Sequence, residues 1–299
     1  TKRVSSRSLN KKAAESLAAA GAFDCFEGTH RAQYFATLPG ETISAIEKTI
    51  KNATADQARA NVKMQTLFGE VAHEEMRNPV LPQTEQWPAL VKLKREKEVT
   101  GVYLSGHPLE DYKMEMNNFC TSTVADLENY KNQEAAIAGI ITTVEHRVSK
   151  NGKPFATFSI EDFTGATELV LFGEEYLKLK HFLVEGTMLF VKGKYQLRYN
   201  SEDRYELKIS SIQLLQDIRE RLTKRVTLNI SLNDVNDQLI LKIEELFTKY
   251  KGNFPVAIQV NDKSDNFSLN FNAQKATVNL SEEFMHMVDE FPEVELKLN

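Results

Sequence analysis

The chain has 299 residues, 41% of them hydrophobic and 26% charged, and its formal net charge is −5. These values are typical of a soluble protein with two or three domains, and the acidic balance argues against a surface coated with phosphate-binding side chains. No apolar run approaches the roughly 18–20 residues of a membrane span, and no charged-then-apolar leader opens the sequence, so we expect a cytoplasmic protein without a membrane partner.

A helical region is predicted over residues 1–60. Its first helix runs from about 10 to 20, where Asn10 can cap it and Gly21 can end it in a left-handed conformation, and the helical pattern resumes from 31 to about 60. The start of this region is basic, with the side chains Lys2, Arg3, Arg7, Lys11 and Lys12. Two interpretations remain open: a capped surface helix, or the end of a helix-hairpin-helix element that holds duplex phosphates.

Residues 61–86 are predicted to form a linker. It contains the short apolar run VKMQTLFGE, followed by the proline-containing segment RNPVLPQTEQWP. A Leu67-Phe68 pair exposed in a linker is what a short peptide needs to fill a preformed apolar groove on a partner. The alternative is that both side chains fold back onto the core of this protein.

Residues 87–130 are predicted to form a helical connector. One helix is expected over ALVKLKREKEVTGVYL, and SGHPLEDYKMEM follows as a loop that leads into another short helix. His107 has neither a nucleophile nor a second histidine at ligand spacing, which favours a structural or capping role. Cys25 and Cys120 form no C-x-x-C pattern. The sequence also holds no two-metal Asp-x-Asp pair, phosphate loop or nucleophile elbow. We therefore expect no active site, metal or cofactor in this chain.

Residues 131–217 are predicted to form a five-stranded barrel. Alternation of apolar with small or polar residues from Ala135 to Val148 indicates the first strand, and Asn151-Gly152 favours a type I′ hairpin after it. The strands PFATFSIED and ATELVLF, a short helix over EEYLKLKHFL, and the strands MLFVKGKYQLRY and RYELKISSIQLL follow. This order of elements is the order of an OB-fold.

Ligands of an OB-fold contact strands 2 and 3 and the loops between strands 1 and 2 and between strands 4 and 5. At these places the sequence combines cations with aromatic rings, as single-strand nucleic-acid binders do. The candidate residues are Arg147, Lys150, Lys153, Phe155, Lys192, Lys194, Arg198, Tyr199 and Arg204. Nearby acids weigh against tight binding, and Phe158, Phe172 and Tyr195 are expected to fill the barrel core.

Residues 218–299 are predicted to form a small α+β domain. The pattern indicates a strand over RVTLNISL, an amphipathic helix that stops at Gly252, strands over NFPVAIQVND, NFSLNFNAQ and ATVNL, a helix capped by Ser281, and a closing strand VELKLN. Acidic residues outnumber basic ones in this part, which favours a protein partner over DNA. The predicted fold class is therefore α+β multidomain: a helical region, a central OB-fold barrel and a small α+β domain.

The runs LNKKAAESLAAAGAFD, MQTLFG and TGVYLSGHPLEDY, then the barrel and the tail ending in VELKLN, resemble in this order the C-terminal part of the bacterial DNA polymerase III alpha subunit. The block GVYLSGHP, residues 101–108, is the most specific part. In that family the polymerase palm, with its metal-binding aspartates, and a phosphoesterase-like domain lie upstream. The resemblance implies a fragment without an active site, from a DNA-directed DNA polymerase that would use Mg²⁺.

The resemblance also implies roles for the parts of the chain. It places the end of a duplex-binding helix-hairpin-helix domain at residues 9–26 and a sliding-clamp peptide, of the form Gln-x-x-[Leu/Met]-Phe, at 64–68. The clamp-binding residues would be Met64, Gln65, Leu67 and Phe68, although the first position holds methionine and the glutamine comes one place late. The barrel resembles a domain that binds single-stranded template, and residues 226–299 resemble a domain that joins the polymerase to the clamp-loader tau subunit.

We therefore expect a role in DNA replication, with single-stranded and primer-template DNA, the sliding clamp and the tau subunit as partners. One alternative is an OB-fold RNA-binding module, such as the anticodon-binding part of a tRNA synthetase, although the tail is too short for the synthetase motifs. Another is a protein-protein scaffold that binds no nucleic acid, which the acidic balance keeps open.

Overall fold

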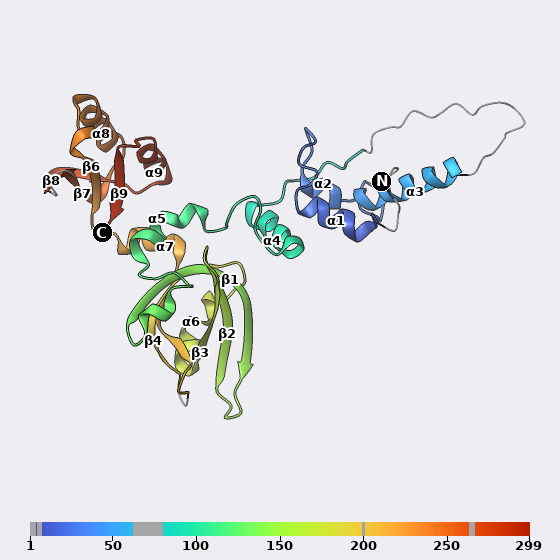
Figure 1. The fold of residues 1–299 in the computed structure, drawn as a ribbon, viewed down its shortest axis with the longest axis horizontal. Helices are drawn as coiled ribbons and strands as arrows, with labels where there is room; N and C mark the ends of the chain where they lie inside the picture. The colour runs from blue at the N-terminus through green and yellow to red at the C-terminus, as the bar shows by residue number, and fades with distance from the viewer. Residues whose placement is uncertain (1–3, 5–7, 62–79, 199–200, 263–266) are drawn as a thin grey trace, which may run out of the picture. The chain divides into compact units, whose positions relative to one another are not determined.

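The structure is a computed structural model that describes residue 4 and residues 8–61, 80–198, 201–262 and 267–299. The chain folds into two compact units, Thr1–Pro108 and Leu109–Asn299. The first unit is helical, and the second holds a five-stranded barrel followed by a small α+β domain (Figure 1). The predicted α+β fold class is confirmed.

The described residues of the first unit form four α-helices: α1 (Lys11–Ala19), α2 (Arg31–Phe35), α3 (Ala45–Asn61) and α4 (Ala89–Thr100). Asn10 caps α1 as predicted, because its Oδ1 accepts a hydrogen bond of 2.9 Å from the Ala13 amide. Gly21 follows α1 with a φ of +88°, the left-handed conformation expected there. Ala14 and Ala18 of α1 are buried and form the centre of a small core between the helices.

The continuous helix expected over residues 31–60 is wrong, because the chain turns between α2 and α3. Pro39 has no amide to donate to a helix, and Gly40 adopts a φ of +82°. An isolated antiparallel bridge between Thr37 and Ser44 closes the turn. The helix that begins after it places Ile46 against the small core of α1.

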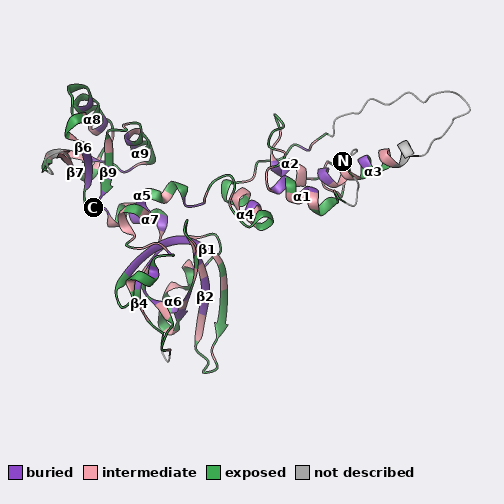
Figure 2. Ribbon diagram, viewed as in Figure 1, coloured by how far each residue is buried: buried purple, intermediate pink, exposed green. Residues whose placement is uncertain are grey.

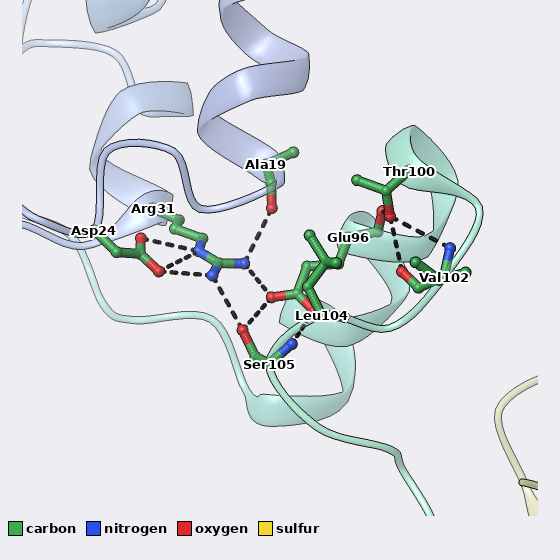
Figure 3. A network of polar contacts seen from close by, with 8 residues as sticks. All are labelled: Ala19, Asp24, Arg31, Glu96, Thr100, Val102, Leu104 and Ser105. Carbon is green, nitrogen blue, oxygen red and sulfur yellow. Dashed lines mark hydrogen bonds and ion pairs between the residues drawn. The ribbon is translucent and has the colours of Figure 1, made fainter.

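A buried ion-pair network joins α2 to α4 within the first unit (Figure 3). The guanidinium of Arg31 lies between two carboxylates, 2.6 Å from Asp24 Oδ2 and 2.5 Å from Glu96 Oε1. Arg31 is 7% exposed and Glu96 is fully buried. The amides of Leu104 and Ser105 donate to Glu96 Oε2 at 3.0 and 2.9 Å. The block GVYLSGHP thus has a structural role, since the backbone amides of its residues 104 and 105 bind the carboxylate of Glu96.

The hydrogen bonds in this network set the protonation of Glu96. Burial alone would raise the pKa of Glu96, but donors from Ser105, Arg31 and Leu104 outweigh burial and lower the pKa to about 2. Asp24, at the other side of Arg31, also has a lowered pKa, chiefly because Arg31 donates to it. Both carboxylates are therefore ionised at neutral pH, with the Arg31 charge between them.

Five antiparallel strands form the barrel of the second unit, in the order β3-β2-β1-β4-β5, with β3 against β5. They are β1 (Glu134–Val148), β2 (Pro154–Glu161), β3 (Ala166–Phe172), β4 (Met188–Leu197) and β5 (Tyr205–Leu214), with α6 (Gly173–Leu179) between β3 and β4. Successive side chains of a strand point to opposite faces, and the inner set includes Ile137, Phe158, Ile160, Leu171 and Val191. The predicted strands and short helix are confirmed in the predicted order.

The turn between β1 and β2 is not the type I′ turn expected from Asn151-Gly152. Of these two residues only Gly152 has a positive φ, +73°. The Gly152 amide donates to the Ser149 carbonyl, and the Ser149 amide donates to the Lys153 carbonyl, both at 2.9 Å. This is the pattern of a three-residue loop with glycine at its left-handed position. Lys150 therefore lies in the loop itself.

The first half of β1 is buried on both sides, as Figure 2 shows, because two helices cover it from outside. These helices are α5 (Lys113–Phe119) and α7 (Leu215–Leu222), of which α7 is absent from the predicted elements. They pack on Ala136, Ala138 and Phe190. Arg219 of α7 donates from Nε to the buried Glu115 of α5 at 2.5 Å, which joins the two helices.

The C-terminal domain is a four-stranded sheet in the order β8-β7-β6-β9. Its elements are β6 (Val226–Ser231), α8 (Asp237–Lys249), β7 (Lys251–Asp262), β8 (Phe267–Val278), α9 (Glu282–Asp289) and β9 (Val294–Leu298). β6 and β7 are parallel and connected by α8, and the other pairs are antiparallel. Ser281 caps α9 as predicted, accepting from the Phe284 amide at 3.3 Å. One strand, β8, replaces the two expected over NFSLNFNAQ and ATVNL, and Gly252 lies within β7 rather than ending the helix.

Candidate nucleic-acid interface

A cross-strand row of three side chains stands on the outer face of the barrel. The strand registers pair Arg147 of β1 with Phe155 of β2, and Phe155 with Phe172 of β3. The rings of Phe155 and Phe172 are stacked, with centroids 5.3 Å apart and planes 22° from parallel. A cation beside two partly exposed rings is the arrangement on which single-stranded bases can stack.

Phe172 was expected in the barrel core, and this expectation is wrong: its side chain is 50% exposed. Its neighbour Leu171 points inward and is buried, so strand alternation turns Phe172 outward. The alternation of apolar side chains in ATELVLF could have identified Phe172 as an outward-facing residue from the sequence. Phe158 is a core residue as expected, at 1% exposure. Tyr195 is half-buried and stacks on Tyr205, with centroids 5.6 Å apart.

The loop beside this row supplies the positive charge. Lys150 and Lys153 are both exposed, one within the β1–β2 loop and one directly after it. Arg147 is also exposed, but it forms an ion pair with Glu145 two residues earlier on the same face. The lysines, with no ion pair to a described residue, are therefore the stronger candidates for phosphate contact.

The β4–β5 hairpin carries a second group of candidate residues. Figure 1 shows that this hairpin and the β1–β2 hairpin project from the same end of the barrel. Arg198 and Arg204 are exposed near its end, where the Arg198 amide donates to the Arg204 carbonyl at 2.8 Å. Arg198 is 3.7 Å from Glu206, which offsets its charge. Tyr199 lies outside the described residues.

Two of the candidate lysines lie apart from the aromatic row. Lys192 and Lys194 of β4 stand opposite Ala136 and Glu134, at the first half of β1, whereas the row crosses the second half. Lys192 lies over the Phe190 ring, 5.3 Å from its centroid. The structure thus places together Arg147, Lys150, Lys153 and Phe155 with the additional Phe172, and leaves these two lysines on a different side.

Most residues proposed for clamp and duplex binding cannot be placed. Met64, Gln65, Leu67 and Phe68 lie outside the described residues, as do Lys2, Arg3 and Arg7. Lys11 and Lys12 stand at the start of α1 and are exposed. Lys11 donates to Glu47 Oε2 at 2.6 Å, and this hydrogen bond is the main reason that the pKa of Lys11 is raised. Lys12 is the freer of the two to meet a phosphate.

Other functional features that the described residues could carry are a metal site, a reactive thiol and a membrane-spanning helix. Across them, no group of three or more His, Cys, Asp or Glu side chains could hold a metal ion. Burial, aided by the charge of Asp162, raises the pKa of the Cys120 thiol to about 12, so the thiolate does not form at neutral pH. No helix in the described part of the chain is long and apolar enough to cross a membrane.

Comparison with known proteins supports a nucleic-acid interface. Residues 135–215 match the family model of the OB-fold nucleic acid binding domain, so the barrel belongs to that class. Residues 226–299 match the DNA polymerase III alpha subunit, C-terminal domain. Together with the relatives below, these matches show that the chain is similar to the C-terminal region of the DNA polymerase III alpha subunit.

The relatives cover nearly the whole chain. DNA polymerase III subunit alpha of Pasteurella multocida (strain Pm70) is 27% identical over 84% of this chain, and that of Bacillus subtilis (strain 168) is 26% identical over 94%. The chain covers 21% and 23% of these two proteins, about a fifth of their length. Among solved structures, asparaginyl-tRNA synthetase from Pyrococcus horikoshii is similar over 33% of this chain and 23% of that chain, at 18% identity and a TM-score of 0.26.

Proposed function

We propose that this chain is the DNA-guiding and docking part of a bacterial replicative polymerase alpha subunit. The similarity to alpha subunits over 84–94% of the chain supports a replication role. The observation that carries the DNA-guiding role is the row of Arg147, Phe155 and Phe172 beside two exposed lysines. In this role the chain positions DNA in the cytoplasm and contributes processivity rather than the chemical step, for which the upstream polymerase domains would use Mg²⁺.

The barrel would hold single-stranded template across β2 and β3. Successive bases stack on Phe172 and Phe155, each stacked base contributing about 1–3 kcal/mol, and Arg147, next along the row, contacts a phosphate. Lys150 and Lys153 meet the phosphates that follow the strand toward the β1–β2 loop. Glu168 and Glu145 on the same outer face repel phosphates, so they confine the backbone to the loop side of the barrel.

Three further contacts complete the proposal. Met64, Gln65, Leu67 and Phe68 bind the sliding clamp, with Leu67 and Phe68 filling an apolar groove on it. The basic start of the chain, including Lys12, holds duplex product. The C-terminal domain docks onto the clamp-loader tau subunit. These roles rest on the resemblance and on the residue types, and they connect the template path to the rest of the replication machinery.

Fluorescence anisotropy of labelled single-stranded DNA, titrated with the whole chain, tests the template role. Phe155→Ala with Phe172→Ala should weaken binding by roughly tenfold or more, because two stacking surfaces are lost. Phe163→Ala is the matched control: this phenylalanine is 42% exposed on the same barrel but lies in the β2–β3 turn, away from the row. Equal affinity of the double variant and the control would remove the proposed template path.

Labelled RNA and duplex DNA of the same length separate the alternatives. Tighter binding of RNA than of single-stranded DNA would favour an RNA-binding module, and no binding at low salt, where phosphate contacts are strongest, would favour a scaffold. Clamp and tau binding are tested independently by Leu67→Ala with Phe68→Ala, and by pull-down of the tau subunit with the whole chain.

A further inference from the structure

The helix layer of the C-terminal domain leaves part of its sheet uncovered. Leu228 and Ile230 of β6 point to the face on which α8 and α9 pack, and they are buried in one core with apolar side chains of both helices. The registers continue this face outward, from Leu228 to Ile258 of β7 and on to Phe271 of β8. The outer strands β7 and β8 therefore carry an apolar face that no helix of the described residues covers completely.

A groove about 440 Å³ in volume follows this boundary. Its floor is the β7–β8 face and its wall is the flank of α8. The lining residues include Val235, Ile240 and Phe247 on the wall side and Ile258, Val260 and Phe271 on the floor. Glu244 is the one charged side chain among the residues that line it.

Large apolar side chains remain exposed along the groove. Phe267, Leu269 and Phe271 alternate along β8 on the groove face and are 55%, 43% and 52% exposed, and Ile240 of α8 is 53% exposed. Single exposed apolar residues are ordinary, but a contiguous patch of this kind marks a binding surface. Figure 2 shows the corresponding mixture of buried and exposed positions on α8.

The dimensions of the open face match one helix. Two neighbouring strands are spaced about 4.8 Å apart and so span roughly 10 Å, which is about the diameter of an α-helix. From Phe267 to Phe271 the apolar side chains extend about 13 Å along β8, the length of a helix of about nine residues. A helix placed here would lie beside α8 and complete the layer that α8 and α9 begin.

The rim of the groove is acidic. Asp237 and Glu244 stand two turns apart on the same flank of α8 as Ile240, and both are exposed. Within the described part of the chain neither side chain has an ion pair. The nearest lysines of α8 are engaged elsewhere: Lys242 lies over the Phe291 ring and Lys249 over the Tyr250 ring. A segment that enters the groove thus meets apolar side chains flanked by uncompensated negative charge.

We propose that this groove binds an amphipathic helix of a partner protein, with its apolar side on Ile258, Val260 and Phe271 and a lysine or arginine facing Asp237 and Glu244. The inference rests on the docking role proposed for the C-terminal domain and names the surface and the chemistry of the segment that docks. Binding is then the addition of a third helix to an incomplete layer, with the cation fixing which side of the helix faces α8.

The test uses the whole chain and two labelled peptides of about 14 residues, long enough to form a helix on binding. One peptide carries leucines on one side of the helix and lysines on the other, at helical spacing, and the second peptide carries glutamate in place of each lysine. The lysine peptide should bind with saturation and gain helical circular dichroism, and Ile240→Lys or Phe271→Ser should weaken it at least about tenfold. Leu177→Lys, at a 54% exposed position on α6, is the matched control and should leave binding unchanged.

Charge reversal tests the orientation. Asp237→Lys with Glu244→Lys should transfer the preference to the glutamate peptide. Equal binding by the groove variants and the control, or no helical gain, would overturn the inference, and so would a concentration-dependent dimer, measured by sedimentation, that Phe271→Ser dissolves. Binding of the lysine peptide without capture of tau would support the groove as a helix-binding site and contradict only the tau docking role. Capture of tau by the groove variants would support the tau docking role and contradict the proposal that the groove is the docking site.

Discussion

Arg31 is the residue on which the first unit depends, because it is the one buried cation between two carboxylates among the described residues of that unit. Replacing Glu96 by glutamine removes the negative charge that compensates Arg31 and replaces one of the two acceptor oxygens of Glu96 with an NH2 donor. Breaking a buried pair from one side costs about 3–5 kcal/mol. We expect Glu96→Gln to lower the free energy of unfolding of this unit by an amount of that order.

Trp87 makes this measurement specific. It is the only tryptophan in the sequence, and it lies in the first unit with the Arg95 guanidinium 4.3 Å from its ring centroid. Tryptophan fluorescence during urea unfolding therefore follows this unit alone. Glu98→Gln, an exposed site two residues further along α4, should stay within about 0.5 kcal/mol of the natural chain. A similar loss in both variants would contradict the role assigned to Glu96.

The low pKa of Glu96 also gives this unit a pH dependence. The pKa is about 2 in the folded chain against a usual value of 4.5, so the folded state favours the charged form. The stabilisation, about 3 kcal/mol at most, is fully present above pH 4.5 and is lost as the pH falls toward 2. The difference in urea midpoint between the natural chain and Glu96→Gln should narrow over that range. A constant difference from pH 6 to pH 2.5 would refute this linkage.

At the scale of elements, the barrel depends on the close approach of β4 and β5. A Cβ added at Gly193 would lie 2.4 Å from the Lys208 carbonyl oxygen, and the strand register shifts at this point. Gly193→Ala must therefore push the two strands apart, at a cost of about 1–3 kcal/mol. Hydrogen exchange of the β4 and β5 amides should become faster in this variant.

Gly165 provides the comparison for that experiment. It lies in the same barrel, and a Cβ there would meet no atom within 4 Å. Gly165→Ala should exchange at the rate of the natural chain. Slow exchange of β4 and β5 in Gly193→Ala would mean that the strands can absorb the methyl group, and that this glycine does not set their spacing.

For the whole molecule, a net charge of −5 means that the DNA affinity must come from a local cluster. If Arg147, Lys150 and Lys153 each meet one phosphate, the logarithm of the binding constant should fall with the logarithm of the salt concentration at a slope of about −2. Lys150→Ala with Lys153→Ala should reduce the slope to about −0.7. Lys178→Ala with Lys180→Ala, the same charge change on and beside α6, should leave it near −2.

The sequence predicts those features of the molecule that depend on neighbouring residues. The five barrel strands, the Asn10 and Ser281 caps and the fold class follow from alternation and from local hydrogen bonding. Contacts between distant segments could not be predicted: Arg31 and Glu96 are 65 positions apart, and either residue alone indicates only a surface charge. Helix α7 was missed because its apolar residues become meaningful only against β1 and β4, which it covers.

The candidate site shows the same division. Lys150, Lys153 and Phe155 could be identified as candidate site residues from their positions in the loop and strand. Phe172 could not, because its exposure depends on which side chains of β3 point into the barrel. That choice, in a strand of seven residues, is settled only when Leu169 and Leu171 are assigned to the core. Lys192 and Lys194 looked equivalent to the other cations because the pattern of β4 does not indicate which half of β1 it pairs with.

The pairing of β9 with β6 determines how the C-terminal domain can be dissected. The amides of Lys224 and Arg225 donate to the Asn299 carbonyl at 2.5 and 2.9 Å, and β9 pairs with β6 from Val294 onward. Deleting the last six residues would convert β6 from an inner strand into an open edge, a template for aggregation. Loss of partner binding after such a truncation would report misassembly, so point substitutions are the sound tool here, and purification tags belong at the opposite end of the chain.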